Sequence, residues 1–353
     1  MKYKLVVVAL IGLSSLAVSG CFKIGSKQQP APLLGVYRSS TRGEVWEPRN
    51  RLVVPAGVGS LDGVSIQRLF ADPQDARALY FSTPGGGLVY TYDGGLTWQQ
   101  PSAITTGTVS DVAIDPRNTC TVYVGVSNRA LKTMDCNRNY QEIYLDPRPN
   151  AVSSITVDGS SSNTIYIGTS AGELLRSVNA GASWARINQF SSGIQWMVFN
   201  PNNAKRVFLL TSNHGLYRSV DGTQSWQSMA SSLAPFSQGQ EIRALQFLND
   251  QPNTMMLLNR YGLLKSSDGG DSWQALSLMT PPLVAKVTAF AVNPNNSQEV
   301  YYATASTFYS SIDGGANWVT RRTPGRRAIQ QQMLIHPRNP ATLLLVLSLA
   351  PSR

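Results

Sequence analysis

The stretch Ser266-Ser267-Asp268-Gly269-Gly270-Asp271-Ser272-Trp273 decides the fold, because the chain repeats it. Close copies occupy residues 91–98 and 311–318, looser copies occupy 177–184 and 219–226, and eroded copies occupy 39–46 and 133–140. The aromatic residues that close these copies follow one another at intervals of about 45 residues, a repeat length typical of four-stranded propeller blades. The repeat therefore predicts a β-propeller and excludes a helical solenoid.

Two short runs with strand character precede each copy. Residues 287–292 and 299–304 are rich in β-branched and aromatic side chains, and an Asn-Pro-Asn-Asn turn at 293–296 separates them. Such runs, bounded by Asn, Pro and Gly, indicate strands joined by turns. Each unit is therefore strand a, an Asp/Asn-Pro turn, strand b, a Gly-containing turn, strand c, the repeated phrase and strand d.

The ends of the chain supply the parts of one further unit. Six complete units end near residues 100, 143, 187, 229, 276 and 322. Residues 35–49 provide only strands c and d, and residues 329–335 and 341–349 provide only strands a and b. The predicted fold is all-β, a single seven-bladed propeller over residues 35–353. Its closing blade joins both chain ends, which removes exposed sheet edges.

The phrase resembles the Asp-box, or BNR, repeat of sialidase-like, sortilin-like and xyloglucanase-like propellers. Its acidic position is filled by Asp93, Asp135, Asn179, Asp221, Asp268 and Asp313. A carboxylate there can accept hydrogen bonds from the backbone of its own turn, and glycine permits positive φ. We interpret these residues as structural. The nearest non-enzymatic analogy is to photosystem II assembly-factor-like propellers, although the Gly- and Trp-rich strand sequences of those propellers are not evident here.

The amino terminus predicts export and lipidation. Residues 1–20 combine Lys2 and Lys4 with an apolar stretch, as in a signal peptide. The sequence Val18-Ser19-Gly20-Cys21 resembles the bacterial lipoprotein box, which implies lipidation of Cys21; the alternative is an ordinary signal peptide with a coincidental Cys. Residues 21–34 then form a flexible linker. The predicted location is the bacterial cell envelope, lipid-anchored and extracytoplasmic, at the inner or outer membrane.

Two cysteines remain after Cys21. Cys120 and Cys136 lie on either side of a predicted hairpin turn at 127–129, almost symmetrically, so the hairpin places them opposite each other. Exported compartments permit disulfides. We therefore predict a disulfide between Cys120 and Cys136.

The chain is basic, and the excess is uneven. The formal net charge is +10, which falls to +8 without Lys2 and Lys4. One group of arginines lies in the connection from the sixth to the seventh blade, and a second belongs to or follows the closing blade. The members are Arg321, Arg322, Arg326 and Arg327 in the first group, and Arg38, Arg42, Arg49 and Arg51 in the second. We expect both groups on the face of the d-to-a loops, here called the loop-bearing face, which also carries the long loops 48–64 and 230–241. They could meet anionic headgroups or an acidic partner, or form a solvated basic surface.

The acidic residues offer little for catalysis. A glycosidase needs two carboxylates across roughly 5 to 10 Å, and only Asp111 and Glu241 lie at or near the start of an innermost strand. The Arg-Ile-Pro segment expected of sialidase-like enzymes is absent. His214 and His336 fall in turns of different blades, on opposite faces, which excludes a His-based metal site or triad. We predict no enzyme activity, no metal and no cofactor.

A polar ring is predicted at the axial mouth. The residue six positions before each Asp/Asn-Pro turn is polar, and Trp196 stands beside the ring. The members are Gln67, Ser110, Ser153, Gln195, Thr288 and Gln331, with Arg243 in the fifth blade by alignment. The ring either hydrates the channel or forms a pocket for a small ligand or a peptide tail, in which Gln195, Trp196 and Arg243 would bind.

These observations predict a non-enzymatic lipoprotein that binds a protein complex through its loop-bearing face. The alternative is a carbohydrate-binding or glycoside-hydrolase-like propeller related to sialidases and xyloglucanases. Partners are the membrane lipid held through Cys21 and a protein complex or anionic membrane surface, with a glycan as the partner under the alternative. Nucleic acid is not expected, because no aromatic-basic binding motif is present.

Overall fold

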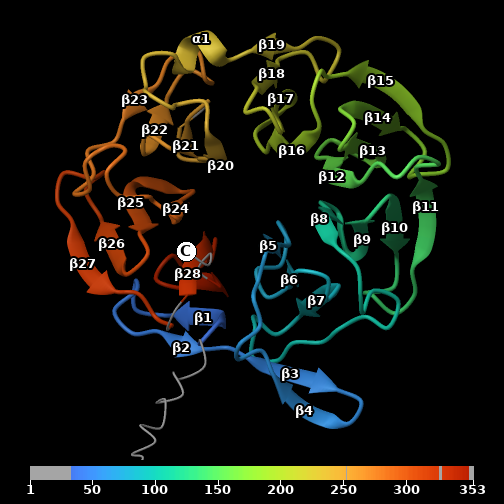
Figure 1. Ribbon diagram of the computed structural model, residues 1–353, viewed down its shortest axis with the longest axis horizontal. Coiled ribbons are helices and arrows are strands. Elements are labelled where there is room, and N and C mark those ends of the chain that lie inside the picture. The colour runs from blue at the N-terminus through green and yellow to red at the C-terminus, as the bar shows by residue number, and fades with distance from the viewer. Residues whose placement is uncertain (1–32, 252, 326–327, 350–353) are drawn as a thin grey trace, which may run out of the picture. The chain divides into compact units, whose positions relative to one another are not determined.

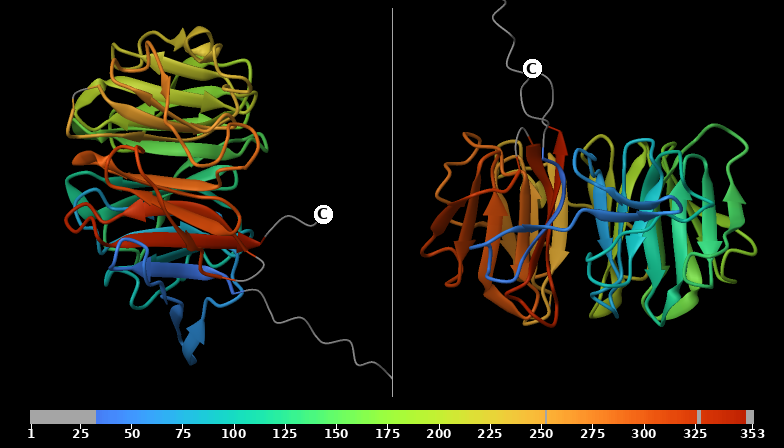
Figure 2. Two further views of the ribbon diagram at one scale, coloured as in Figure 1. Left: turned by 90° about the vertical axis from the view of Figure 1, so that its left-hand side faces the viewer. Right: turned by 90° about the horizontal axis from the view of Figure 1, so that it is seen from below.

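The computed structural model describes residues 33–251, 253–325 and 328–349, and nearly all of its regular structure is β. Antiparallel sheets surround a central axis, with the chain passing from blade to blade around the ring (Figure 1). Seen from the side, the strands run roughly along that axis (Figure 2). The predicted seven-bladed propeller is confirmed.

Blades two to six contain four strands each, in chain order from the axis outward. Blade two holds β8 (Val109–Asp115), β9 (Asn118–Val126), β10 (Arg129–Thr133) and β11 (Gln141–Leu145), and blade three holds β12 (Val152–Asp158), β13 (Ser161–Thr169), β14 (Glu173–Ser177) and β15 (Ala185–Gln189). Blade four holds β16 (Ile194–Asn200), β17 (Asn203–Thr211), β18 (Leu216–Ser219) and β19 (Gln227–Ser228), and blade five holds β20 (Ile242–Phe247), β21 (Met255–Asn259), β22 (Leu263–Ser266) and β23 (Gln274–Ala275). Blade six holds β24 (Ala289–Asn293), β25 (Asn296–Ala303), β26 (Thr307–Ser311) and β27 (Val319–Arg322).

The closing blade combines both ends of the chain, as predicted. Its order is β28 (Ala328–Ile335), β29 (Leu343–Leu349), β1 (Gly35–Ser39) and β2 (Glu47–Pro48). β1 and β29 are antiparallel, with Gly35 opposite Leu347 and Ser39 opposite Leu343. The direction of these strands places the start of β1 and the end of β29 on the loop-bearing face.

The region around blade one differs from the prediction. Blade one holds β5 (Arg68–Ala71), β6 (Leu79–Ser82) and β7 (Leu88–Thr91), and its fourth strand is reduced to a bridge between Tyr90 and Gln99. The segment 48–64, predicted as a loop, contains the hairpin of β3 (Arg51–Val54) and β4 (Gly57–Ser60). The hairpin runs beside residue 98 and projects from the ring (Figure 1). The other long connection contains a short helix, α1 (Ala230–Leu233).

The core is divided among the contacts between neighbouring blades. Each of seven buried clusters in the described residues joins one blade to the next. Between the closing blade and blade one, Val36 and Val346 pack with Phe81 and the fully buried Trp98. Trp98 Nε1 also donates to the Arg49 carbonyl at 2.7 Å. Burial of these apolar surfaces therefore holds the ring together, blade against blade.

The turns of the repeated phrase bond to themselves. In blade five, Ser266 Oγ donates to Asp268 Oδ1 at 2.8 Å, and the Ser272 N–H donates to the same oxygen at 3.0 Å. Gly270 has φ +96°, which glycine adopts without strain, and a Cβ there would lie 3.3 Å from the Phe208 ring of the preceding blade. In blade three Asn179 accepts from the Ser183 N–H in the same way.

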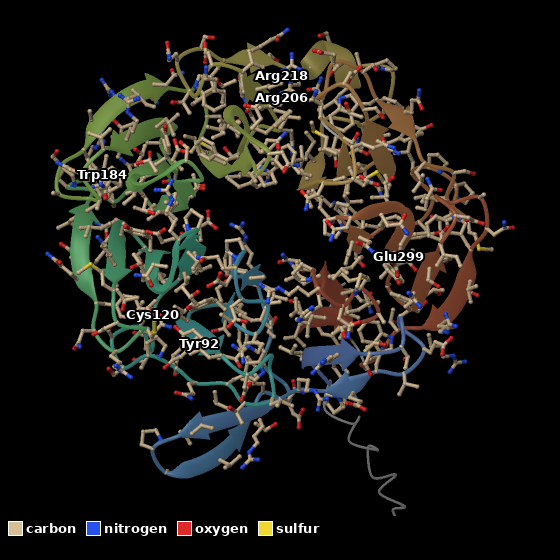
Figure 3. All side chains as sticks on the ribbon, turned by 180° about the vertical axis from the view of Figure 1, so that it is seen from behind. Tyr92, Cys120, Trp184, Arg206, Arg218 and Glu299 are labelled. Atoms are coloured by element: carbon tan, nitrogen blue, oxygen red, sulfur yellow. A yellow bond between two sulfur atoms is a disulfide. The ribbon has the colours of Figure 1, made fainter. Side chains whose placement is uncertain are left out.

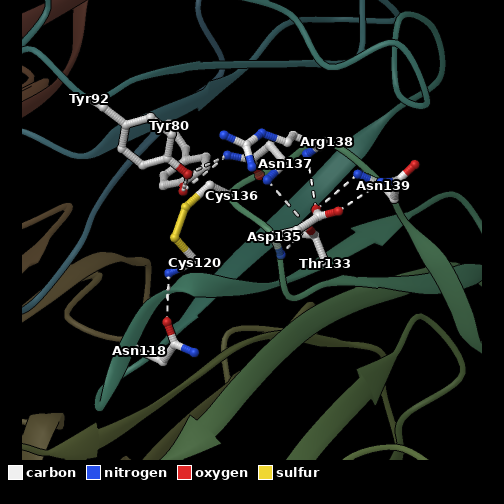
Figure 4. Close-up of a disulfide and its surroundings, with 10 residues drawn as sticks. All are labelled: Tyr80, Tyr92, Asn118, Cys120, Thr133, Asp135, Cys136, Asn137, Arg138 and Asn139. Carbon is white, nitrogen blue, oxygen red and sulfur yellow. Dashed lines mark hydrogen bonds between the residues drawn. A yellow bond between two sulfur atoms is a disulfide. The ribbon is translucent and has the colours of Figure 1, made fainter.

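The predicted disulfide is confirmed. Cys120 and Cys136 are bonded and lie near the end of the blade that carries the repeated turn (Figure 4). Cys136 has φ 59° and occupies the position that glycine holds in the close copies. Beside it, Asn137 donates to the Tyr92 hydroxyl at 2.7 Å and accepts from Tyr140 at 2.6 Å. This network joins blades one and two where the closing residue is Tyr140 instead of Trp.

No helix in the described part of the chain has the length and apolar character needed to cross a bilayer.

Candidate functional site

The predicted polar ring is built from β-bulges. In blades two to five and in blade seven, the inner strand skips one residue in its pairing with the next strand, and the skipped residue is the ring residue. These residues are Ser110, Ser153, Gln195, Arg243 and Gln331. The other two blades show a related arrangement. The Gln67 N–H donates to the carbonyl of Ser82, which pairs with Arg68. The Thr288 N–H donates to the carbonyl of Ala303, which pairs with Ala289. A bulge leaves its extra residue unpaired and re-aims its side chain, and bulges are frequent beside functional sites.

The bulged residues use their side chains in two ways. The Ser110 and Ser153 hydroxyls reach a carbonyl of their own blade and one of the next blade, at Val152 and Ile194 respectively. Thr288 reaches Gln330 of the closing blade at 3.4 Å. These hydroxyls therefore help to tie neighbouring blades together.

The three glutamines of the ring behave differently. Gln67, Gln195 and Gln331 are exposed, and within the described residues their side-chain amides form no hydrogen bond, unlike the neighbouring Gln332, which bonds to the backbone of Leu69. A glutamine amide offers two donors and one acceptor oxygen. These side chains are therefore available to a ligand.

A central cavity of about 1380 Å³ lies inside the ring. Gln195, Trp196 and Arg243 all line it, together with Gln67 and Gln331. Residues near both ends of the inner strands contribute, so the cavity extends along them. Trp196 is partly buried against the cluster between blades four and five. Tyr261 and Phe236 pack edge to face with ring centroids 5.3 Å apart.

Asp111 provides the one carboxylate among the described lining residues, and both of its oxygens interact with neighbouring protein groups. Asp111 Oδ1 lies 3.4 Å from Arg68 Nη1, and Oδ2 accepts from Ser154 Oγ and the Ile155 N–H, each at 3.1 Å. Burial raises the pKa of Asp111, although the Arg68 charge and these hydrogen bonds oppose the change. Asp111 thus connects blades one, two and three.

Arg243 brings positive charge to the cavity. Its Nη1 donates to the Val287 carbonyl at 2.8 Å, which draws the guanidinium toward blade six. Burial, followed by the nearby charge of Arg260, lowers the pKa of Arg243. The charge of Arg243 in turn lowers the pKa of Lys286, another lining residue, with burial adding to the effect.

The prediction that all of the arginines in the two groups share one face is wrong for Arg42. Arg42 lies in the repeated turn of the closing blade, on the opposite face, where its Nε donates to the buried Glu299 at 2.9 Å. Although burial alone would raise it, the pKa of Glu299 is lowered by hydrogen bonds from Tyr301, Asn293 and Arg42. Figure 3 shows Glu299 among the side chains of blade six.

The remaining arginines are only partly available. Arg321 and Arg322 belong to strand β27 and not to the following loop, and Arg321 pairs with Glu44 at 2.9 Å. Arg49 pairs with Glu47 at 2.6 Å. Arg322 and Arg51 are exposed. Arg326 and Arg327 lie outside the described residues, as does Cys21.

The described residues contain no group of three His, Cys, Asp or Glu side chains suited to a metal ion. His214 lies in the β17–β18 turn on the loop-bearing face. His336 lies in the β28–β29 turn on the other face, where its Nδ1 accepts from the Asn339 N–H at 3.1 Å. The two histidines therefore do not form one site.

Sequence reasoning missed Lys286 and Arg260, and it did not recognise the bulges. Lys286 lies two residues before the ring residue Thr288, so extending the ring alignment backward could have found it. The proximity of Arg260 depends on how β20 and β21 pair, because its N–H donates to the Glu241 carbonyl at 3.0 Å. No local pattern gives this contact.

Comparison with known proteins supports the fold class. The family model described as sortilin, neurotensin receptor 3 (Sortilin-Vps10) matches residues 172–277, which lie within blades three to five. No curated protein matches the sequence.

Solved structures match over most of the chain. A GH74 xyloglucanase from Xanthomonas campestris has a TM-score of 0.63 and 17% identity; the match covers 81% of this chain and 51% of the enzyme. This chain therefore spans about half the length of that enzyme. YCF48 from Cyanidioschyzon merolae has a TM-score of 0.60 and 17% identity, covering 80% of this chain and 95% of YCF48. A structure of YCF48 bound to D1 peptide gives 0.61 and 17%, covering 82% and 93%. At these identities the likeness shows the fold, a β-propeller, and not an activity.

Proposed function

We propose that this propeller is a binding and scaffold protein that engages a protein complex through its loop-bearing face. The observation that carries the proposal is the ring of seven polar positions on the inner strands, five of which are β-bulges. Exposed glutamine amides and Arg243 face a cavity there, and the one carboxylate described in its lining is tied into the wall. Ligand sites of this kind are concave and carry a few convergent polar groups.

The likeness to YCF48 bound to D1 peptide supports a peptide-binding use of the fold. The match covers nearly all of that protein, so no additional domain is needed to build a propeller of this type.

We further propose that Cys21 carries a lipid and tethers the propeller to a bacterial membrane surface. β1 begins on the loop-bearing face, so a tether would hold that face close to membrane-bound partners. Metabolic labelling with a radioactive fatty acid tests this part: label should enter the wild-type chain and not Cys21→Ser. Labelling of the variant would contradict it.

Site-specific photo-cross-linking in the native membrane tests the binding role. A photoreactive residue at Gln195 should capture a defined protein partner. The matched control is Val178, which is 62% exposed and lies in a repeated turn on the opposite face. Equal capture from both positions, or none from Gln195, would refute the proposal.

A second candidate is a carbohydrate-binding or glycoside-hydrolase-like propeller. The fold likeness to GH74 xyloglucanases and the position of Trp196 in the cavity favour it, because aromatic faces provide broad contact surfaces for ligands. Binding of xyloglucan oligosaccharides that is lost in Trp196→Ala, with hydrolysis measured separately, would support this candidate.

A further inference from the structure

Two basic residues, Arg243 and Lys286, line the central cavity, and a third, Arg260, lies near enough for its charge to lower the pKa of both. Arg243 is the bulged residue of β20, and its bond to the Val287 carbonyl sets its guanidinium beside the segment that carries Lys286. Arg260 follows β21 and is bonded through its backbone to Glu241, just before β20. Arg243, Arg260 and Lys286 are here called the rim cations.

The rim cations are not neutralised within the described structure. None of them lies within 4.0 Å of a carboxylate oxygen among the described ion pairs. Glu241 is the acid whose charge opposes their mutual repulsion. Three like charges beside one acid raise the electrostatic energy of this cluster, and an anion would relieve that repulsion.

Several other arginines in this fold are paired. Arg68 faces Asp111, Arg42 faces Glu299, and Arg218 faces Asp271 at 2.7 Å. Glu173 is shared between Arg148 and Arg186. The rim cations therefore contrast with these pairs.

We propose that the rim cations form an anion-binding subsite for a carboxylate of an acidic peptide segment that enters the central cavity. The inference rests on the proposed protein-binding function and specifies the chemistry of the partner. Guanidinium groups match carboxylates in planar geometry. The exposed amides of Gln195 and Gln331 in the same cavity can bond the N–H and C=O groups of a peptide backbone. The carboxylate can come from an acidic side chain or from a chain terminus.

Fluorescence anisotropy with the full chain in detergent micelles tests the inference. Three labelled peptides share a neutral Gly-Ser-Gln sequence: one has a free carboxyl terminus, one has an amide terminus and two glutamates, and one has an amide terminus and no acid. We expect at least one acidic peptide to bind about tenfold more tightly than the neutral one, with an advantage that shrinks as salt rises. The peptide that gains identifies the source of the carboxylate.

Matched variants locate the effect. Arg260→Gln combined with Lys286→Gln should remove the preference for acid, whereas Lys205→Gln, an exposed cation near the opposite face, should retain it. Thermal unfolding of each variant checks that the fold is intact. A preference that survives the double substitution overturns the inference.

Other outcomes are equally decisive. Equal binding of all three peptides, absence of binding at millimolar concentration, or tighter binding of an oligogalacturonate would each overturn the inference. If the Gln195 cross-linker still captures a protein in any of these cases, the proposed function stands without it.

Discussion

The repeated turns and the bulges of the inner strands recur around the same ring, yet their side chains behave differently. In the turns of blades one to six, the acidic position accepts from its own backbone in every copy, including Asn179. At the bulges the serines bond to the next blade, while Gln195 and Gln331 extend into the cavity. A position that repeats with fixed partners maintains the fold, whereas a position that repeats in backbone geometry but varies in residue type can serve the ligand binding proposed above.

The largest loss of stability is expected from the aromatic residue that closes a repeated turn. Trp98→Ala removes a fully buried ring that packs 4.8 Å, centroid to centroid, from Phe81, and also a hydrogen bond to the Arg49 carbonyl. Truncation of a buried aromatic residue costs about 3–5 kcal/mol. Urea unfolding measures this loss, and a loss below about 1 kcal/mol would contradict the structural role assigned to the repeat.

Reduction of the Cys120–Cys136 disulfide should cost nearly as much. The bond closes a loop of 16 residues, for which the chain-entropy estimate is about 3 kcal/mol. Cys120→Ser combined with Cys136→Ser should lower the unfolding midpoint in non-reducing buffer. In the same variant a reducing agent should have no further effect.

Acid should weaken the turns. Hydrogen bonds, led by that from Ser225, lower the pKa of Asp221 to about 2, and those from Asn317 do the same for Asp313. Because the folded pKa lies below the usual value, this stabilisation is complete above about pH 4 and is lost as pH falls toward 2. The variant Asp313→Asn introduces the amide that Asn179 provides in blade three. It should be less stable than the wild type at pH 7, and its free energy of unfolding should fall less than that of the wild type between pH 4 and pH 2. Urea midpoints across this range measure both effects.

The smallest effects are expected at the bulges, and they should differ by residue. Ser153→Ala loses the hydroxyl contacts to Gly168 and Ile194, at a cost of about 1 kcal/mol. Gln195→Ala loses no described hydrogen bond and should change stability by less than about 0.5 kcal/mol. Equal losses of unfolding free energy in the two variants would contradict the distinction between bulged residues that bond to the next blade and those that do not.

The sequence predicted the fold well because its signals are local. The Asp-Gly turn and its closing Trp lie within eight residues, so they can be recognised without knowledge of tertiary contacts. The disulfide followed from symmetry about one hairpin. The hairpin β3–β4 was missed, although Val53 and Val58 lie on either side of the Pro55-Ala56 turn, a pattern that allows a short hairpin.

The site was less predictable because it depends on contacts between blades. The ring alignment named Gln195 and Arg243, which line the cavity, but it did not show that Ser153 bonds to the next blade. The grouping of Arg42 with the other arginines was wrong, since strand direction puts it beside Glu299 on the opposite face. Such pairings join residues far apart in the chain and have no sequence period.

The pairing of β1 with β29 has a consequence for folding kinetics. The contact of Gly35 with Leu347 spans nearly the whole chain, and contacts of this range make folding slow. Until β29 arrives, β1 has an unpaired edge, which is a hazard for aggregation. During synthesis from the amino terminus, β1 is therefore made before β29, the strand with which it pairs. The time for which the edge of β1 is exposed to chaperones and proteases depends on how quickly β29 follows.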